Sequence, residues 1–265
     1  MFNDKSYETV NREERFYCAL FSHALLTSAA VRERFGRLVL DRCDLRLDAD
    51  SLHVFVEAAA LRDYWYDLGS PLEYSNKTHD RRREILNELF SIVGLEPELI
   101  DQHDFFWTSS AGQPNSKLWS PGRWNIPRDG HADLSSESLK HLHRLKWAFN
   151  AKPDILLVSG RSVLMLEAKL ESGEGVYDKS EGSRQTHIQK LIGTILGRLA
   201  PSFRHSTIKP CTLGLWGPLD SIAPNKRKSN FSWKEVANCC ETPEVDPFTK
   251  SCLSSLERYR SEGPG

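Results

Sequence analysis

Two apolar runs joined by two residues dominate the centre of the chain. They are PDILLVS (153–159) and SVLMLEAK (162–169), and Gly160-Arg161 stands between them. A glycine at the first of two central positions is what a type II′ hairpin turn requires. The sequence therefore predicts a two-residue β-hairpin in which Ile155 faces Leu166 and Asp154 faces Glu167.

Both faces of this hairpin are apolar away from its open end. One face carries Ile155, Leu157, Leu164, Leu166 and Ala168, and the other carries Leu156, Val158, Val163 and Met165. A strand pair that is apolar on both sides is typical of the middle of a covered sheet. We therefore expect the hairpin to form the centre of the core.

Three charged residues interrupt this apolar context at the open end. Asp154 and Glu167 are expected on one face with their Cβ atoms roughly 4.5–5.5 Å apart, and Lys169 shares that face because strand side chains alternate. Two buried carboxylates repel each other, and Lys169 neutralises only one of them. A divalent cation such as Mg²⁺, which takes hard oxygen ligands, would compensate the pair.

The rest of the chain predicts helices around this hairpin. We expect helices at EERFYCALFSHALL (13–26), at DRRREILNELFSIVGL (80–95) ending near Gly94, at about 135–145, from about Arg184, and at WKEVANCC (233–240). Further strands are predicted at KWAFN (146–150) and CTLGLWG (211–217), while 45–61 is compatible with strand or helix. Loops are predicted at 105–133 and 171–183, and a disordered tail from Ser261.

At the hairpin the sequence resembles the PD-(D/E)xK nuclease superfamily. Pro153-Asp154, twelve intervening residues and Glu167-Ala168-Lys169 match its motif in order and spacing. The resemblance covers the helix near residue 14 and roughly 145–240. It implies an α/β fold with a mixed central β-sheet flanked by helices, in a restriction-endonuclease-like α-β-β-β-α-β core. The remaining residues would form a largely helical N-terminal elaboration.

The resemblance also implies roles for individual residues. Asp154 and Glu167 would ligate Mg²⁺, with Mn²⁺ as a substitute, and the Ala168 carbonyl would join them. Lys169 would orient or activate the attacking water. A structural ion pair between Lys169 and an acid is the alternative to a catalytic site.

Two further positions are open to more than one interpretation. Glu14 would be an additional metal ligand, although Glu13 is the alternative, and Asn11 with Glu14 also fits a helix capping box. On the helix from about Arg184, Gln189 or Gln185 would place the nucleophile or the phosphate. Either glutamine is equally compatible with an ordinary solvated helix face.

Composition restricts the partners that we expect. The chain has 265 residues and a net charge of −1, so nucleic acid would be bound through local basic patches such as 81–83 or 226–228. The near-neutral charge is also compatible with binding by a homodimer or together with a partner subunit. Six cysteines without a CxxC pair are expected to be reduced thiols. No run approaches the roughly 18 apolar residues of a membrane span, and we expect a cytoplasmic protein.

The paired acids and the resemblance together predict a metal-dependent nuclease, with DNA favoured over RNA as its substrate, and the resemblance alone implies a role in restriction or phage defence. The alternatives are an RNA-directed nuclease and a nuclease fold kept as a binding or assembly module. Within a single domain we expect a first core helix in 1–30, a helical elaboration with a long Gly/Pro/Trp loop in 31–144 and the nuclease core in 145–260. Endonucleolytic or exonucleolytic action, specificity, a required activator and the role of 45–133 stay open.

Overall fold

The computed structural model describes residues 14–69, 75–110, 112, 116–127, 133–170, 185–218 and 229–262, with the backbone alone for 257–262. The described residues form two compact units. The sheet unit comprises those within Met1–Ala58, Pro153–Gly175 and His205–Gly265. The helical unit comprises those within Ala59–Lys152 and Val176–Arg204.

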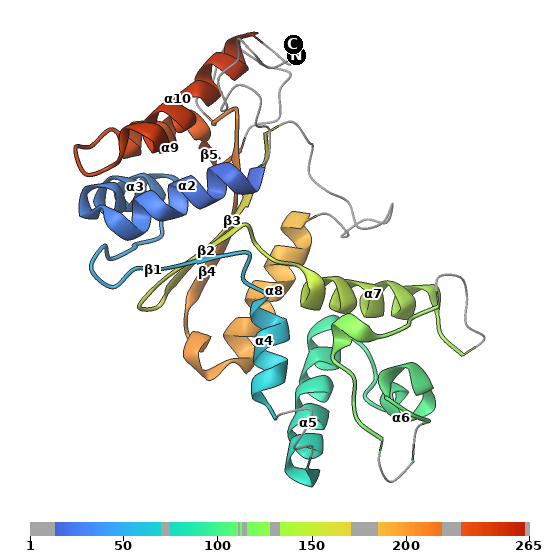
Figure 1. The fold of residues 1–265 in the computed structure, drawn as a ribbon. Helices are drawn as coiled ribbons and strands as arrows, with labels where there is room; N and C mark the ends of the chain where they lie inside the picture. The colour runs from blue at the N-terminus through green and yellow to red at the C-terminus, as the bar shows by residue number, and fades with distance from the viewer. Residues whose placement is uncertain are drawn as a thin grey trace. The chain divides into compact units, whose positions relative to one another are not determined.

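The sheet unit contains a five-stranded mixed sheet (Figure 1). Its strands are β1 (His53–Val56), β2 (Ile155–Ser159), β3 (Ser162–Ala168), β4 (Thr207–Gly214) and β5 (Phe231–Ser232). They lie in the order β1-β2-β3-β4-β5. The pairs β1–β2 and β2–β3 are antiparallel, whereas β3–β4 and β4–β5 are parallel. The predicted α/β class with a mixed sheet is confirmed.

The β2–β3 hairpin has the predicted register. Ile155 pairs with Leu166 and Ser159 pairs with Ser162. Gly160 has a φ of 55°, which lies in the left-handed region where glycine carries no steric penalty. The turn glycine therefore fixes which residues face each other along the whole pair.

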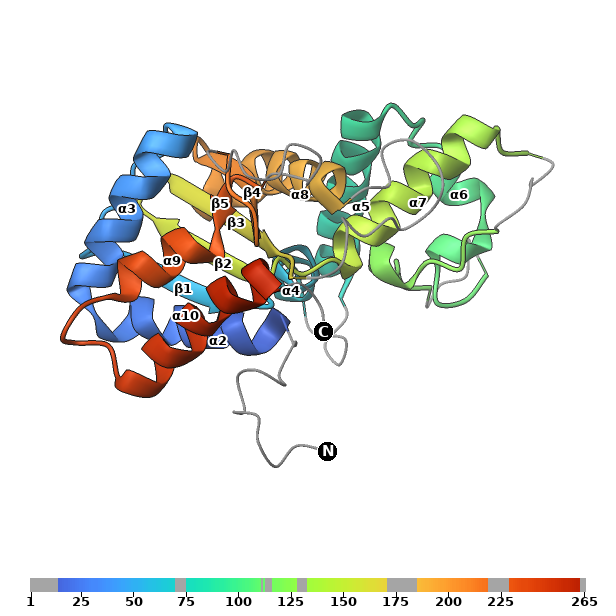
Figure 2. The ribbon, with the colours of Figure 1, turned by 90° about the horizontal axis from the view of Figure 1, so that it is seen from above.

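One face of the sheet is covered by four helices of the same unit (Figure 2). They are α2 (Glu14–Thr27), α3 (Ala29–Cys43), α9 (Trp233–Cys240) and α10 (Pro247–Glu262). Tyr17, Phe21 and Leu25 of α2 are 0–1% exposed, and each such side chain contributes roughly 1.5–3 kcal/mol by leaving water. This apolar stripe anchors α2 on the core and fixes the position of its first residue, Glu14.

Side-chain caps define where two of these helices begin. The Ser28 hydroxyl accepts a hydrogen bond from the Val31 amide at 3.1 Å ahead of α3. Ser232 and Glu235 form a reciprocal capping box at the start of α9. Such caps satisfy amides that the first helical turn leaves without partners.

The helical unit surrounds an aromatic core. It contains α4 (Ala60–Asp67), α5 (Asn76–Val93), α6 (Leu99–Gln102), α7 (Ser136–Asn150), α8 (Gln185–Leu199) and the short 3₁₀ helices η1 (Asp104–Phe106), η2 (Pro121–Arg123) and η3 (Pro201–Phe203). The fully buried aromatic side chains of this unit are Trp65, Phe90, Phe106, Trp124 and Phe149. Three of the five lie in α4, α5 and α7, and the other two lie in the predicted long loop.

Several predicted helices are confirmed with small shifts of their ends. The helix predicted at 13–26 is α2, and the one predicted at 80–95 is α5, which Gly94 ends with a φ of 76°. The predicted strand at 211–217 is the second half of β4. In the loop predicted at 105–133, the described residues include η1, η2 and a bridge between Trp107 and Leu118.

The prediction of a strand at KWAFN is wrong, because 146–150 forms the last part of α7. Leu142, Leu145 and Phe149 are all buried, and their spacing continues the apolar stripe of a single helix. The strand that precedes the hairpin in the sheet is instead β1, which pairs with β2 on the side away from β3. It lies inside the segment 45–61, which was compatible with strand or helix.

The chain end also differs from its prediction. Ser261 and Glu262 belong to α10, a helix that the sequence did not predict. The predicted loop at 171–183 and the basic run 226–228 lie outside the described residues. Of the part of the chain that is described, no helix has the length and apolar character needed to cross a membrane.

Candidate active site

The open end of the β2–β3 hairpin brings Asp154 and Glu167 together. Asp154 directly precedes β2, and Glu167 is the penultimate residue of β3. The antiparallel pairing of the two strands ends at Ile155 and Leu166, and Asp154 and Glu167 are the next residues along the two strands. The Asp154 carbonyl also accepts a hydrogen bond from the Glu57 amide at 3.1 Å, which ties this end of the hairpin to the end of β1.

The Asp154 carboxylate is held by the backbone of the opposite strand. Its Oδ2 accepts a hydrogen bond from the Ala168 amide at 2.7 Å. Ala168 is fully buried and Asp154 is half-buried. A short bond to a rigid strand amide fixes the direction of the carboxylate.

Lys169 connects the acids electrostatically. Its Nζ donates a hydrogen bond to Glu167 Oε1 at 2.9 Å and lies 3.6 Å from Glu14 Oε2. Its backbone amide donates to the Leu213 carbonyl of β4 at 2.7 Å. The strand pair therefore positions the residue, and one ammonium group serves two carboxylates.

Glu14 reaches this site from α2, as the resemblance implies. As the first residue of the helix, it accepts a hydrogen bond on Oε1 from the Leu170 amide at 2.9 Å. The alternative acid Glu13 and the capping partner Asn11 lie outside the described residues. Glu14 thus closes the site from the helical face of the sheet unit.

Burial, together with neighbouring negative charge, raises the pKa values of both hairpin acids. For Glu167 the pKa is raised to about 7, first by burial and then by the neighbouring Asp154 charge, with Lys169 opposing the shift. Burial likewise raises the pKa of Asp154, against the lowering effect of the Ala168 amide and Lys169. Among the described residues, the site therefore places three acids around one lysine.

Lys169 itself stays protonated. Burial works against its charge, but the combined attraction of Glu167, Glu14 and Asp154 outweighs burial and raises its pKa. A permanently charged ammonium suits the stabilisation of a developing anion.

Three residues near the site have no counterpart in the sequence prediction. Glu57 has a φ of 50°, rare for a residue with a side chain, and forms an ion pair with Arg15 at 2.6 Å. Cys18 lies one helical turn after Glu14, and its pKa is raised first by burial and then by Asp154, Glu14 and Glu167. None of these three residues belongs to a recognisable spacing pattern, because β1 and α2 are distant from the hairpin in sequence.

The donor atoms of this site fit a divalent cation of the magnesium type. Opposed carboxylates with raised pKa values supply hard oxygen ligands and need positive charge, and Mg²⁺ commonly binds through only one or two carboxylates. Among the described residues, no group of three or more His, Cys, Asp or Glu side chains is arranged to hold an ion. The fit is therefore to a cation bound by Asp154 and Glu167 and completed by water and substrate.

The two glutamine candidates belong to the helical unit. Gln189 is 3% exposed on α8, and Gln185, the first residue of that helix, is half-buried. The solvated-face interpretation is therefore wrong for Gln189. Its catalytic role stays a prediction, as the geometry of the acidic site comes from the sheet unit alone.

Two of the three arginines in the basic run 81–83 are engaged in contacts within the fold. Arg82 is 5% exposed, and Arg83 forms an ion pair with Asp101. Arg81 is exposed. This run therefore offers little free charge for a nucleic-acid backbone.

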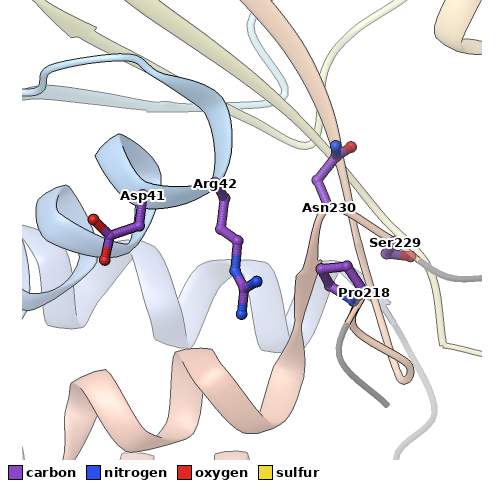
Figure 3. Close-up of a pocket in the computed structure, with 5 residues that line it drawn as sticks. All are labelled: Asp41, Arg42, Pro218, Ser229 and Asn230. Carbon is purple, nitrogen blue, oxygen red and sulfur yellow. The ribbon is translucent and has the colours of Figure 1, made fainter. Parts of the chain in front are cut away.

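A separate polar pocket lies elsewhere in the sheet unit (Figure 3). It has a cavity volume of about 460 Å³ and is lined by Asp41, Arg42, Pro218, Ser229 and Asn230. The Arg42 side chain extends towards α9, where its Nη2 lies 2.7 Å from Glu235 Oε1, while Asp41 points away from the cavity. None of these lining residues is an acid of the hairpin site.

No family model matches the chain, and neither a curated protein nor a solved structure matches it. The candidate site therefore stands on its own geometry and on the sequence motif that predicts it.

Proposed function

We propose that the chain is a nuclease that hydrolyses phosphodiester bonds, in DNA before RNA, in a reaction that depends on Mg²⁺ or Mn²⁺. The observation that carries the proposal is the pair of acids, Asp154 and Glu167, at the open end of a buried hairpin, beside a lysine that contacts Glu167 and Glu14. A purely structural ion pair needs one acid for one lysine, and this site has three.

The order of elements supports the same proposal. Apart from α3, which follows α2, and the helices from α4 to α7, which lie between β1 and β2, the elements follow the α-β-β-β-α-β order of the PD-(D/E)xK superfamily as α2, β1, β2, β3, α8 and β4. The motif residues stand at the corresponding ends of β2 and β3. The position of β1 replaces the predicted strand at 146–150 without changing that order.

Each residue of the site would have a defined role in such a reaction. Asp154 and Glu167 would hold the cation, with the Ala168 carbonyl beside them. When bound, the cation would polarise the phosphodiester and lower the pKa of water. The hydrogen bond from the Ala168 amide keeps the Asp154 carboxylate in one orientation.

Lys169 would stabilise negative charge on the phosphate and orient the attacking water. Glu14 acts mainly as a positioning residue, because it holds the Lys169 ammonium and the Leu170 amide. In that role it keeps the lysine directed towards the acids as charge develops on the substrate.

A cleavage assay tests the proposal directly. Plasmid, linear duplex, single-stranded DNA and RNA would be incubated with the chain and Mg²⁺ or Mn²⁺, beside Asp154→Ala and Lys169→Ala. We expect metal-dependent cleavage that both substitutions abolish, and the products would distinguish endonucleolytic from exonucleolytic action.

Calorimetry with Mn²⁺ on the same samples separates the alternatives. Binding to the original chain but not to Asp154→Ala, without cleavage, would indicate an enzyme that needs an activator or partner. Absence of both cleavage and metal binding would contradict the proposal and favour a binding or assembly module.

A further inference from the structure

Two cysteines that are far apart in sequence lie together in the sheet unit. The Sγ atoms of Cys43 and Cys211 are 3.3 Å apart, although 168 positions separate the residues in the chain. Cys43 is the last residue of α3, and Cys211 lies in the middle of β4. The thiols therefore connect a covering helix to a strand of the sheet.

The two thiols differ in accessibility and in acidity. Cys43 is half-buried, whereas Cys211 is 4% exposed. The pKa of Cys43 is lowered, first by its hydrogen bond with Cys211 and further by Lys209 and Arg42, against burial. The same hydrogen bond and burial raise the pKa of Cys211.

Arg42 lies at this position for a structural reason of its own. Its guanidinium forms an ion pair with Glu235, which is the capping-box partner of Ser232 at the start of α9. The cation next to Cys43 is thereby fixed and favours the thiolate, which is the reactive form of cysteine.

We propose that Cys43 and Cys211 form an oxidisable pair, which a peroxide or a low-molecular-weight disulfide converts into a disulfide between α3 and β4. The pair is independent of the proposed nuclease activity. Bringing the sulfurs from 3.3 Å to a bond length of about 2.0 Å requires a shift of only about 1.3 Å.

The reaction with hydrogen peroxide balances in two steps. The Cys43 thiolate attacks one peroxide oxygen, the O–O bond breaks, and the leaving hydroxide takes a proton, which leaves a Cys43 sulfenic acid and water. The Cys211 sulfur then attacks the Cys43 sulfur and loses its proton. The departing hydroxide takes that proton, so two thiols and one peroxide give one disulfide and two waters.

Closing so long a loop should stabilise the sheet unit markedly. A crosslink across more than a hundred residues restricts the unfolded chain strongly, and its expected effect is a rise of about 10 °C in the unfolding temperature of that unit. Dithiothreitol should reverse the rise.

The test uses the full chain treated with hydrogen peroxide or glutathione disulfide. Free thiols would be counted with a maleimide label, and peptide mass spectrometry would locate any crosslink. We expect two of the six thiols to disappear and a Cys43–Cys211 peptide to form. Cys239→Ser, which removes another buried cysteine of the same unit, is expected to give the same peptide.

Variants separate the two roles. In Cys211→Ser, Cys43 should accumulate as a sulfenic acid that dimedone traps, and in Cys43→Ser, Cys211 should resist oxidation. If either variant is misfolded before oxidation, the proposal is judged from the crosslinked peptides of the original chain. Oxidation of Cys239 or Cys240 as fast as Cys43, or a Cys43 oxidised without the crosslink, would overturn the proposal.

Discussion

Both units bury a charged group, and they accommodate it in different ways. In the helical unit, Arg82 donates hydrogen bonds to the Gly69 and Leu118 carbonyls at 3.1 and 3.5 Å, and its guanidinium lies over the Trp65 ring. In the sheet unit, the Lys169 ammonium contacts Glu167 and Glu14, and Asp154 interacts with it electrostatically without a direct contact among the described ones. One buried charge is surrounded by neutral acceptors, whereas the other group keeps an excess of like charge.

We propose that this difference separates a structural from a functional burial of charge. A buried cation with carbonyl partners stabilises the fold around it. Buried acids close to one another cost free energy, and under the proposed function a bound cation would offset that cost. The predictions below use this contrast, beginning with the largest expected effect.

Removing a charge from the acidic site should abolish activity. We expect Asp154→Asn and Lys169→Met each to lower the cleavage rate about 10³-fold, equivalent to about 4 kcal/mol of transition-state stabilisation. Rates would be measured on a labelled duplex with Mg²⁺. The control Asp50→Asn removes an exposed acid of the same unit and should retain full activity. A loss smaller than tenfold in Asp154→Asn would contradict the assigned role.

Removing the buried cation of the helical unit should affect stability instead. Arg82→Met removes the hydrogen bonds that the guanidinium donates to the Gly69 and Leu118 carbonyls, so we expect a destabilisation of about 3 kcal/mol. Urea denaturation followed by tryptophan fluorescence measures this loss. Arg81→Met is the matched control and should change the free energy of unfolding by less than about 0.5 kcal/mol. Equal losses of stability in Arg82→Met and Arg81→Met would contradict a structural role for the buried Arg82 charge.

The acidic site should make the folded chain less stable as the pH rises. A carboxylate whose pKa is lowered on folding has the opposite effect. Because the pKa of Glu167 rises from 4.5 to about 7 on folding, the folded state binds the proton more tightly. Its stabilising effect is complete below pH 4.5 and is lost as the pH rises to about 7, and the raised pKa of Asp154 acts in the same direction.

We therefore expect the free energy of unfolding in EDTA to fall by on the order of 2–3 kcal/mol between pH 4.5 and 7.5. Urea denaturation at half-unit pH intervals measures this slope. Glu167→Gln, which is neutral throughout, should flatten it. An unchanged slope in that variant would show that the acid is not the source.

Adding metal should recover part of this stability. At a Mg²⁺ concentration ten times Kd, the free energy of unfolding at pH 7.5 should rise by about 1.4 kcal/mol. Thermal denaturation with Mg²⁺ and with EDTA gives the difference. The rise should vanish in Asp154→Asn and persist in Asp50→Asn; the same rise in both variants would place the cation elsewhere.

The sequence predicted the hairpin and three residues of the site because they depend on local chemistry. A two-residue turn at Gly160 sets the pairing of β2 with β3, and strand alternation then places Asp154, Glu167 and Lys169 on one face. Each step involves neighbours within a few residues. Glu14 was predicted only through the family resemblance, since nothing in its own segment refers to the hairpin.

The failures concern partners that are distant in sequence. β1 pairs with β2 across about a hundred residues, and short apolar runs such as 53–56 and 146–150 do not show by themselves which is strand. The contribution of Glu57 depends on that same pairing. The meeting of Cys43 with Cys211 likewise follows from how α3 lies on β4, which no spacing rule encodes.

The discontinuity of the sheet unit has a consequence during synthesis. Its strands β4 and β5 and its helices α9 and α10 follow β3 in the chain, whereas Glu14 precedes every strand of the sheet. At translation rates of about 5–20 residues per second, β4 is synthesised roughly 10–40 s after Glu14 and a few seconds after Asp154 and Glu167. Any activity of this site is therefore acquired only after the strand that holds the Lys169 backbone has been made.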